Sequence, residues 1–423
     1  MSKTAPSSLS LILTIVLVGL NLRPFMTGPG PVIDNIIQTT GMSYQSISLL
    51  TLLPMLLMGV GALVVPMLNQ RIGERAGIST AMLLLLVGSL ARYFVADGAA
   101  LLLTAFLCGV GAAYIQSVFP GLIKANFPQK MAMMTGLYSA TLMAGGAIGA
   151  QLTPLVEEMT GHWQSALAWL AFPALLALLA IWANVHTERG SKADRVSVLV
   201  FLRKPRAWLL MAGFGLINAG YGTVVTWLAP FFQEQGMSAA QSGSFVAILT
   251  VFQALSALMI PVFASHNIDR RFWLIVTLSC QALGFSGLML FASDAPLLWV
   301  ALLGMGLGGC FALSIITALD HLPHPVSAGA LTSLMQAGGF IIAAFGPLCA
   351  AWIQQLSQSF TWVWAMHVVF VLVTLILYLR LNPKSYSQIF NLNWLISSLF
   401  IANDNYCYLG VFLSLSLFIY SSR

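Results

Sequence analysis

The chain has 423 residues, of which 59% are hydrophobic and 7% are charged, whereas about 25% of residues are charged in an ordinary soluble protein. This balance excludes a soluble fold and predicts a protein whose main partner is the lipid bilayer, not nucleic acid. The five cysteines have no paired spacing, so we expect no disulfide framework, no metal site and no cofactor.

Twelve apolar stretches follow one another along the chain, each long enough for a helix of about 20 residues that crosses a bilayer. Such long segments suit helices, not a barrel, and predict an all-α polytopic membrane protein. The first stretch lacks a small-residue cleavage site, so we expect it to be a retained span. The predicted spans are 10–35, 44–68, 76–95, 98–121, 132–156, 165–186, 207–232, 242–264, 272–291, 296–319, 328–354 and 360–381.

The basic residues between the spans predict the orientation. If the N-terminus is cytoplasmic, the basic linker 187–206 and nearly all other loop Lys and Arg residues fall on the cytoplasmic side. These other residues are Arg71, Arg75, Lys124, Lys130, Arg270, Arg271, Arg380 and Lys384. The opposite loops carry acidic residues instead, so the positive-inside rule favours this orientation.

An internal repeat divides the spans into two sets of six. The residues that recur 193 positions later are Gly136 with Gly329, Gly145 with Gly338, and Pro154 with Pro347. We therefore expect an N-terminal half at 1–186 and a C-terminal half at 207–384, with a site between them, as in transporters. Residues 385–423 differ in composition, and we expect an atypical tail of uncertain structure outside this unit.

The loop after the second span resembles the loop motif of the major facilitator superfamily. Leu68, Arg71, Gly73 and Arg75 match that motif, whereas Gln70 stands where an aspartate is usual. The resemblance implies twelve helices in two pseudo-symmetric halves and a cytoplasmic gating role for Arg71, Gly73 and Arg75. A basic turn that only obeys the positive-inside rule is an equally good interpretation.

Within that superfamily the chain is most similar to the cyanate transporter branch, which also includes nitroimidazole-type transporters. The matching stretches are 19–24 with Thr27, 120–124, 215–221 and 318–321. This resemblance implies a monomeric carrier for a small anion such as cyanate in a bacterial inner membrane. Because the branch is mixed, export of nitroimidazole-like or other amphipathic drugs is the alternative. A membrane enzyme or a channel is disfavoured, since the spans contain neither a catalytic cluster nor a continuous polar stripe.

Arg23 is the main candidate for a substrate site. It stands near the middle of the first span, where a charged side chain costs about 2.5–3.5 kcal/mol on insertion scales. Either an anionic substrate or a structural partner must offset that cost, and we favour the substrate. Pro24, Pro29 and Pro31 should bend or break this helix and free carbonyl groups beside it.

Other polar residues in the spans are weaker candidates for substrate binding. They are Asn21 and Thr27 in the first span, Asn218 and Tyr221 in the seventh, Gln116 in the fourth and Gln336 in the eleventh. Each could donate a hydrogen bond to a small ligand or hold neighbouring helices together. Arg92 lies near the end of the third span, where we expect it to reach the lipid headgroups, although it could instead face inward and attract anions.

Two further motifs favour structural interpretations. Gly136, Gly145 and Gly149 have the spacing of an antiporter motif, but Ala150 replaces its proline, so close helix packing is the preferred role. The segment 320–324 contains one aspartate and two histidines, and we expect a solvated loop there, not a metal site. No acidic residue lies in the middle of a span, so the sequence leaves ion coupling and the direction of transport open.

Overall fold

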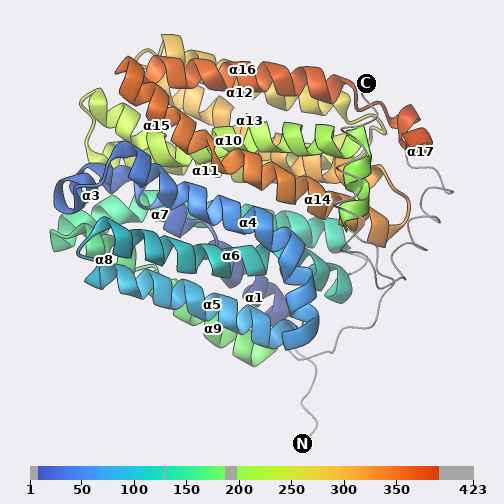
Figure 1. Cartoon of the computed structure of the whole chain (residues 1–423), viewed down its shortest axis with the longest axis horizontal. Coiled ribbons are helices and arrows are strands. Elements are labelled where there is room, and N and C mark those ends of the chain that lie inside the picture. The colour runs from blue at the N-terminus through green and yellow to red at the C-terminus, as the bar shows by residue number, and fades with distance from the viewer. Residues whose placement is uncertain (1–7, 128–129, 186–197, 390–423) are drawn as a thin grey trace, which may run out of the picture.

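The computed structural model describes residues 8–127, 130–185 and 198–389 (Figure 1). Within these ranges the chain is helical and has no β-strand, which confirms the predicted all-α class. Eleven helical stretches of the described part are long and apolar enough to cross a membrane. A further helix of 30 residues, α7 (Met131–Thr160), covers the predicted span 132–156. The structure therefore agrees with twelve spans.

The other spans follow the predicted order. In the first part of the chain they are α4 (Tyr44–Ile72), α5 (Glu74–Ala91), α6 (Gly98–Asn126), α7, and α8 (Trp163–Ala168) with α9 (Ala171–Asn184). In the second part they are α10 (Pro205–Glu234), α11 (Ala239–Ala264), α12 (Arg271–Leu290), α13 (Pro296–Asp320), α14 (Pro325–Ala344) with α15 (Gly346–Ser357), and α16 (Phe360–Leu379). Short 3-10 turns lie at η2 (Arg92–Phe94), η4 (Val198–Arg203) and η5 (Pro383–Ser385), and α17 (Tyr386–Ile389) follows.

Two predicted segments fall largely outside the described residues. Most of the linker 187–206 lies in the gap 186–197, and the tail is described only as far as residue 389. The proposed boundaries of the two halves therefore stay predictions.

The first span is broken into four pieces, as its prolines predict. These pieces are α1 (Ser8–Leu20), α2 (Pro24–Thr27), η1 (Gly30–Val32) and α3 (Ile33–Thr40). Proline has no backbone N–H, so Pro24, Pro29 and Pro31 each leave the carbonyl four residues earlier without its helical donor. Arg23 lies at the first break.

Glycines of α7 let the broken span come close. A Cβ atom at Gly145 would collide with the carbonyl oxygen of Leu20, and one at Gly149 would lie 2.6 Å from the Cα atom of Pro24. Only glycine permits so near an approach of two backbones. The predicted packing role of these glycines is thus confirmed at two positions.

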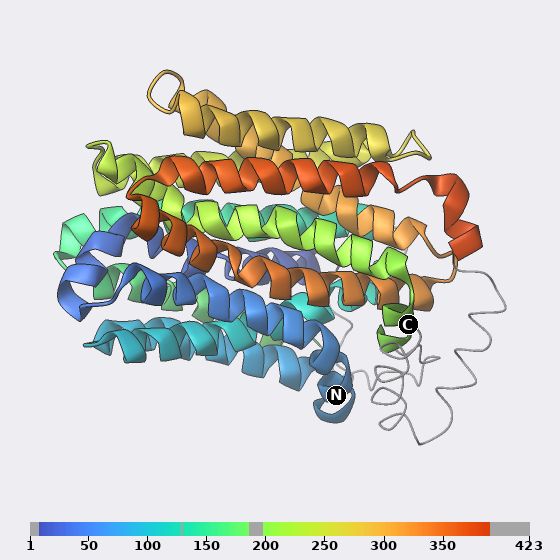
Figure 2. The same ribbon diagram turned by 45° about the horizontal axis from the view of Figure 1, so that its top comes forward.

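The same arrangement recurs in the second half. Gly338 of α14 would place a Cβ atom against Met211 of α10, and Gly339 would place one 3.3 Å from the amide nitrogen of Gly215. The glycines of α14 therefore allow close packing of α10, as those of α7 allow close packing of the first span. Gly145 and Gly338, one from each helix, are a pair of residues that the internal repeat aligns. Helices from the two parts meet where α7 packs on α11 and α4 packs on α14, and Figure 2 shows the second of these contacts.

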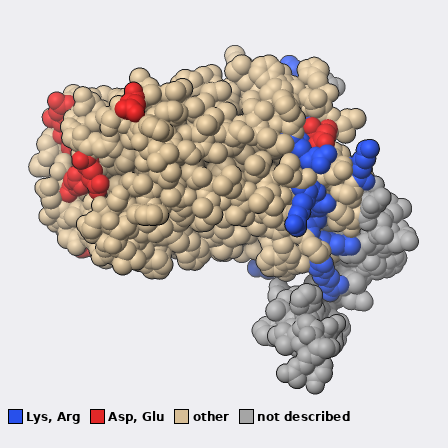
Figure 3. All heavy atoms as spheres, turned by 90° about the horizontal axis from the view of Figure 1, so that it is seen from above, with Lys and Arg blue, Asp and Glu red and all other residues tan. Residues whose placement is uncertain are grey.

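Charged residues gather at opposite ends of the molecule (Figure 3). One end, called the basic end below, carries Arg71, Arg75, Arg203, Arg270, Arg271 and Arg380. The other, called the acidic end, carries Asp34, Asp97, Glu157, Glu234 and Asp294. Large apolar side chains, such as Phe172, Leu255 and Ile376, are exposed on the sides between the two ends. This distribution suits a body that crosses a bilayer with its ends in water.

Candidate functional site

Arg23 is a buried cation without a counter-ion in the described part of the chain. Only 3% of its surface is exposed, and its Nε and Nη1 atoms have no hydrogen-bond partner there. Both ion pairs of the described residues, Arg270 with Asp320 and Arg271 with Asp269, lie at the basic end. The site therefore has positive charge and two donors that the described residues leave unused.

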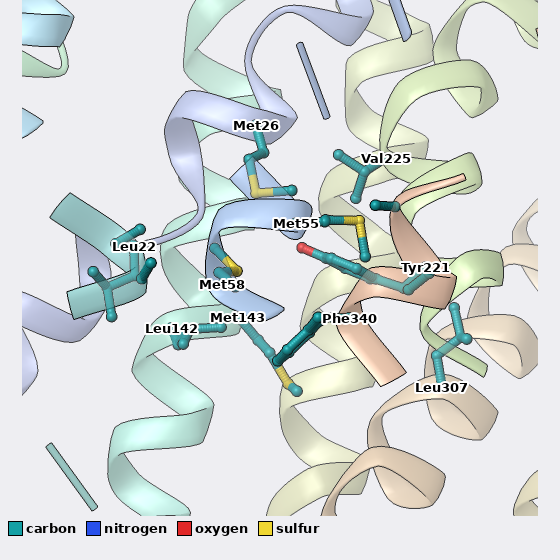
Figure 4. Close-up of a cluster of buried hydrophobic side chains, with 14 of the residues drawn as sticks. Leu22, Met26, Met55, Met58, Leu142, Met143, Tyr221, Val225, Leu307 and Phe340 are labelled. Atoms are coloured by element: carbon teal, nitrogen blue, oxygen red, sulfur yellow. The ribbon is translucent and has the colours of Figure 1, made fainter. Parts of the chain in front are cut away.

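Tyr221 of α10 lies against this cation. The Cζ atom of Arg23 is 4.7 Å from the centroid of the Tyr221 ring, and both side chains are buried. A cation over an aromatic face away from water is worth about 2 kcal/mol. Figure 4 shows the Tyr221 hydroxyl pointing toward methionine side chains in a buried cluster. The labelled members of this cluster include Met26, Met55, Met58, Met143 and Phe340.

The two other candidates of the first span, Asn21 and Thr27, donate hydrogen bonds to backbone carbonyls. The Nδ2 atom of Asn21 donates to Leu17 (2.8 Å) and to Pro173 of α9 (3.1 Å). The Oγ1 atom of Thr27 donates to the carbonyl of Gly146 on α7 (2.8 Å). Asn21 thus uses both amide protons, and each of these side chains ties the broken span to a neighbouring helix.

The remaining candidates differ in how their polar atoms are used. Asn218 is buried and donates from Nδ2 to the carbonyl of Phe214 (2.8 Å) on its own helix. Gln116 on α6 is half-buried, and its Oε1 atom has no hydrogen-bond partner in the described part of the protein. Gln336 is half-buried on α14. Contact with Arg23 is thus found for Tyr221, while a joint role of the other residues stays a prediction.

The motif loop between α4 and α5 is fastened within its own half. Gly73 has φ +82°, a conformation that favours glycine, and its amide donates to the carbonyl of Asn69. The Nη2 atom of Arg75 donates to the carbonyl of Trp182 on α9 (2.8 Å). Arg71 is exposed in the last turn of α4. A gating role for Arg71, Gly73 and Arg75 stays a prediction.

Arg92 does not lie where the sequence predicted it. It does not extend to the headgroups but is fully buried, with both Nη atoms 3.2 Å from the carbonyl oxygen of Phe25. Its Nε atom donates to the hydroxyl of Thr104 (3.3 Å). The expectation failed because a strong acceptor inside the bundle, the Phe25 carbonyl, lies within reach of this span end.

The segment after α13 also differs from expectation at His321. This ring is 2% exposed and stacks on Tyr386 of α17 at 3.7 Å, so it does not belong to a solvated loop. Burial lowers the pKa of His321 from 6.5 to about 4, so the ring is neutral at neutral pH. Asp320 pairs with Arg270, and the described residues contain no group of three potential metal ligands.

Contacts between the two halves close the acidic end. The Tyr44 ring stacks on Trp227 at 5.1 Å, and the Thr51 and Thr226 hydroxyls lie 2.7 Å apart. The Nε2 atom of Gln233 donates to the carbonyl of Pro31 (2.8 Å). Gln45 and Gln355 form one more hydrogen bond across the halves.

Trp227 contributes a second contact to this closure. Its side chain is fully buried between the halves, where Nε1 donates to the carbonyl of Pro347 (2.9 Å). The closed acidic end could not be predicted from any one stretch of the sequence, because the residues that form its contacts come from spans one, two, seven and eleven.

Comparison with known proteins agrees with this architecture. Solved structures of low sequence identity share the fold. A bacterial homolog of the human lysosomal transporter Spinster has a TM-score of 0.73 at 17% identity, covering 92% of this chain and 99% of that one. A D-xylose-proton symporter has a TM-score of 0.68 at 15% identity, covering 87% and 97%.

Two relatives of higher identity are transporters of Escherichia coli K12. The chain is 40% identical to the cyanate transport protein CynX over 383 residues, which cover 90% of this chain and 99% of the relative. It is 30% identical to the 2-nitroimidazole transporter over 356 residues, 82% of this chain and 88% of that protein. The predicted resemblance to this branch is confirmed. Residues 11–331 match the Major Facilitator Superfamily, and the chain belongs to that family.

Proposed function

We propose that this protein is a secondary active carrier, not an enzyme, that moves a small anion such as cyanate across the bacterial inner membrane. It works as a monomer by alternating access, with the halves 1–186 and 207–384 rocking around a site between them. The similarity to the cyanate transport protein over nearly its whole length supports the choice of substrate.

The observation that carries the proposal is the state of Arg23. Burying a charge without a counter-ion costs several kcal/mol, which is a large fraction of the net stability of a typical domain. An anion that binds next to Arg23 would offset this cost by supplying the missing counter-ion. The Nε and Nη1 donors of Arg23, which have no partner in the described residues, would then bind the anion by charge-assisted hydrogen bonds.

The charge distribution and the closed acidic end support an orientation and a conformational state. By the positive-inside rule, the basic end and the N-terminus lie in the cytoplasm. The contacts of Thr51 with Thr226 and of Tyr44 with Trp227 would then close the outer side. In this state an anion at Arg23 is closed off from the outer side.

Transport in proteoliposomes tests the proposal. Purified protein should give saturable uptake of radiolabelled cyanate and counterflow against unlabelled cyanate, which does not depend on the direction of net transport. Arg23→Ala should reduce the initial rate to background, and Arg23→Lys should also impair it, because an ammonium group lacks the planar fork of a guanidinium. Lys130→Ala, which removes an exposed charge, is the control. Normal uptake by Arg23→Ala protein would refute the site.

The methionine-rich surroundings of Tyr221 favour one second candidate function. Flexible thioether side chains adapt to apolar ligands of different shapes, as drug exporters require. The relative named 2-nitroimidazole transporter supports this alternative. For such a neutral cargo, cells that express Arg23→Ala should keep their resistance to 2-nitroimidazole, while cyanate uptake is lost. Resistance that disappears together with cyanate uptake would instead point to one shared site.

A further inference from the structure

The buried Arg92 is the second cation inside the N-terminal half. It stands at the turn that follows α5, where its neighbours Tyr93 and Phe94 are exposed, yet none of its own surface is. Its three guanidinium nitrogens are all occupied, by the carbonyl of Phe25 and the hydroxyl of Thr104. Arg92 is therefore unlike Arg23, because each of its three guanidinium nitrogens donates to a group within the protein.

The carbonyl of Phe25 can accept hydrogen bonds from Arg92 because a proline follows it in the chain. In a regular helix the carbonyl of Phe25 would accept a hydrogen bond from the amide of residue 29. That residue is Pro29, which has no N–H to donate. Arg92 supplies two N–H groups to this carbonyl from another span. The guanidinium thus replaces the helical hydrogen bond at the second break of the first span.

The position of that bond matters for Arg23. Phe25 lies in the one-turn helix α2, which begins directly after Arg23. One side of this turn rests on Gly149 of α7, and the Phe25 carbonyl is held by Arg92. The hydrogen bond from Thr27 to the carbonyl of Gly146 (2.8 Å) also fastens the turn to α7. These three contacts, together with the backbone hydrogen bonds of the turn itself, determine where the Arg23 side chain leaves the backbone.

We propose that Arg92 is a positioning residue for the anion site: it holds the α2 turn through the Phe25 carbonyl and so orients Arg23. This inference rests on the proposed function, since it assumes that Arg23 binds the anion. Thr104 extends the arrangement, because its hydroxyl donates to the carbonyl of Leu101 (2.7 Å) and accepts from the Nε atom of Arg92. Neither Arg92 nor Thr104 touches the substrate.

Kinetics of two conservative variants test this role. Arg92→Lys keeps the charge and one hydrogen bond but not the fork, and Thr104→Val keeps the shape but not the acceptor. Both should raise the KM for cyanate, by about tenfold for Arg92→Lys, since small displacements of a binding group have large effects. The maximal rate should change much less, and Thr104→Ser should restore the wild-type KM. Ser89→Ala, at a buried position of α5 that is close to Arg92 in sequence, is the matched control and should leave KM unchanged.

Three outcomes separate the possibilities. A raised KM in Arg92→Lys and Thr104→Val, with normal values in Thr104→Ser, supports the positioning role. Unchanged KM values in these variants, with lower melting temperatures and with uptake that Arg23→Gln still abolishes, overturn the positioning role and leave the proposed function intact. Normal uptake by Arg23→Gln overturns both, because no anion site would then remain at Arg23 for Arg92 to position.

Discussion

The guanidinium of Arg23 lies 4.7 Å from the ring centroid of Tyr221 and so joins the broken first span to α10. These two elements belong to different halves of the repeat. An anion bound to Arg23 would compete with, or add to, a contact that both halves share. Ligand binding at this place can therefore alter the balance between two arrangements of the halves, as alternating access requires.

The ring and the hydroxyl of Tyr221 can be tested separately. Tyr221→Phe keeps the aromatic face and should retain a KM for cyanate close to that of the wild type. Tyr221→Leu removes the cation–π contact, worth about 0.5–2 kcal/mol, so KM should rise about two- to thirtyfold. Initial uptake rates over a range of cyanate concentrations measure both. If Tyr221→Phe is as impaired as Tyr221→Leu, the hydroxyl, and not the ring, is the functional part.

Replacement of Arg23 by an apolar residue should stabilise the protein while it abolishes transport. A buried charge without a counter-ion is costly, and even buried ion pairs can often be replaced by well-packed apolar residues with a gain of about 1–4 kcal/mol. Arg23→Met should thus raise the melting temperature of the purified protein in detergent without substrate. Arg206→Met is the matched control, because Arg206 donates to the carbonyl of Arg380 and to Ser385, so its loss should lower that temperature. Destabilisation by Arg23→Met would show that Arg23 is structural.

Local chemistry explains why much of the fold was predictable. Apolar length alone located the spans, because each crossing must satisfy its backbone internally. The breaks of the first span followed from prolines that lack an N–H group, and Gly145 and Gly149 followed from the need for close packing. Arg23 stood out because a charge in an apolar span is rare.

The surroundings of Arg92 and His321 were not predictable in the same way. Each lies near a span end, where contact with headgroups or water was the reasonable expectation. Each is instead covered by a residue distant in sequence, Arg92 by Phe25 and His321 by Tyr386. The sequence contained one indirect signal, since Pro29 leaves a carbonyl in need of a donor, but it does not say which residue supplies it.

Acid should weaken the contact of His321 with Tyr386. The folded protein holds the pKa of His321 at about 4, below the value near 6.5 of an unfolded chain. Below pH 6.5 the unfolded state therefore binds a proton that the folded state excludes, and stability falls from there toward pH 4. His321→Phe keeps an aromatic ring for the stack and should show a smaller loss of melting temperature over this interval. His324→Phe, at an exposed position, should behave as the wild type does.

A disulfide across the closed acidic end should arrest transport. The Thr51 and Thr226 hydroxyls are 2.7 Å apart, so cysteines at both positions would place their two sulfur atoms close to each other. Oxidation of Thr51→Cys, Thr226→Cys protein should abolish cyanate counterflow, because the halves could no longer separate there, and reductant should restore it. The wild type and each single variant, treated alike, control for the native cysteines. Full counterflow by protein that mass spectrometry shows to be cross-linked would mean that this contact does not open during transport.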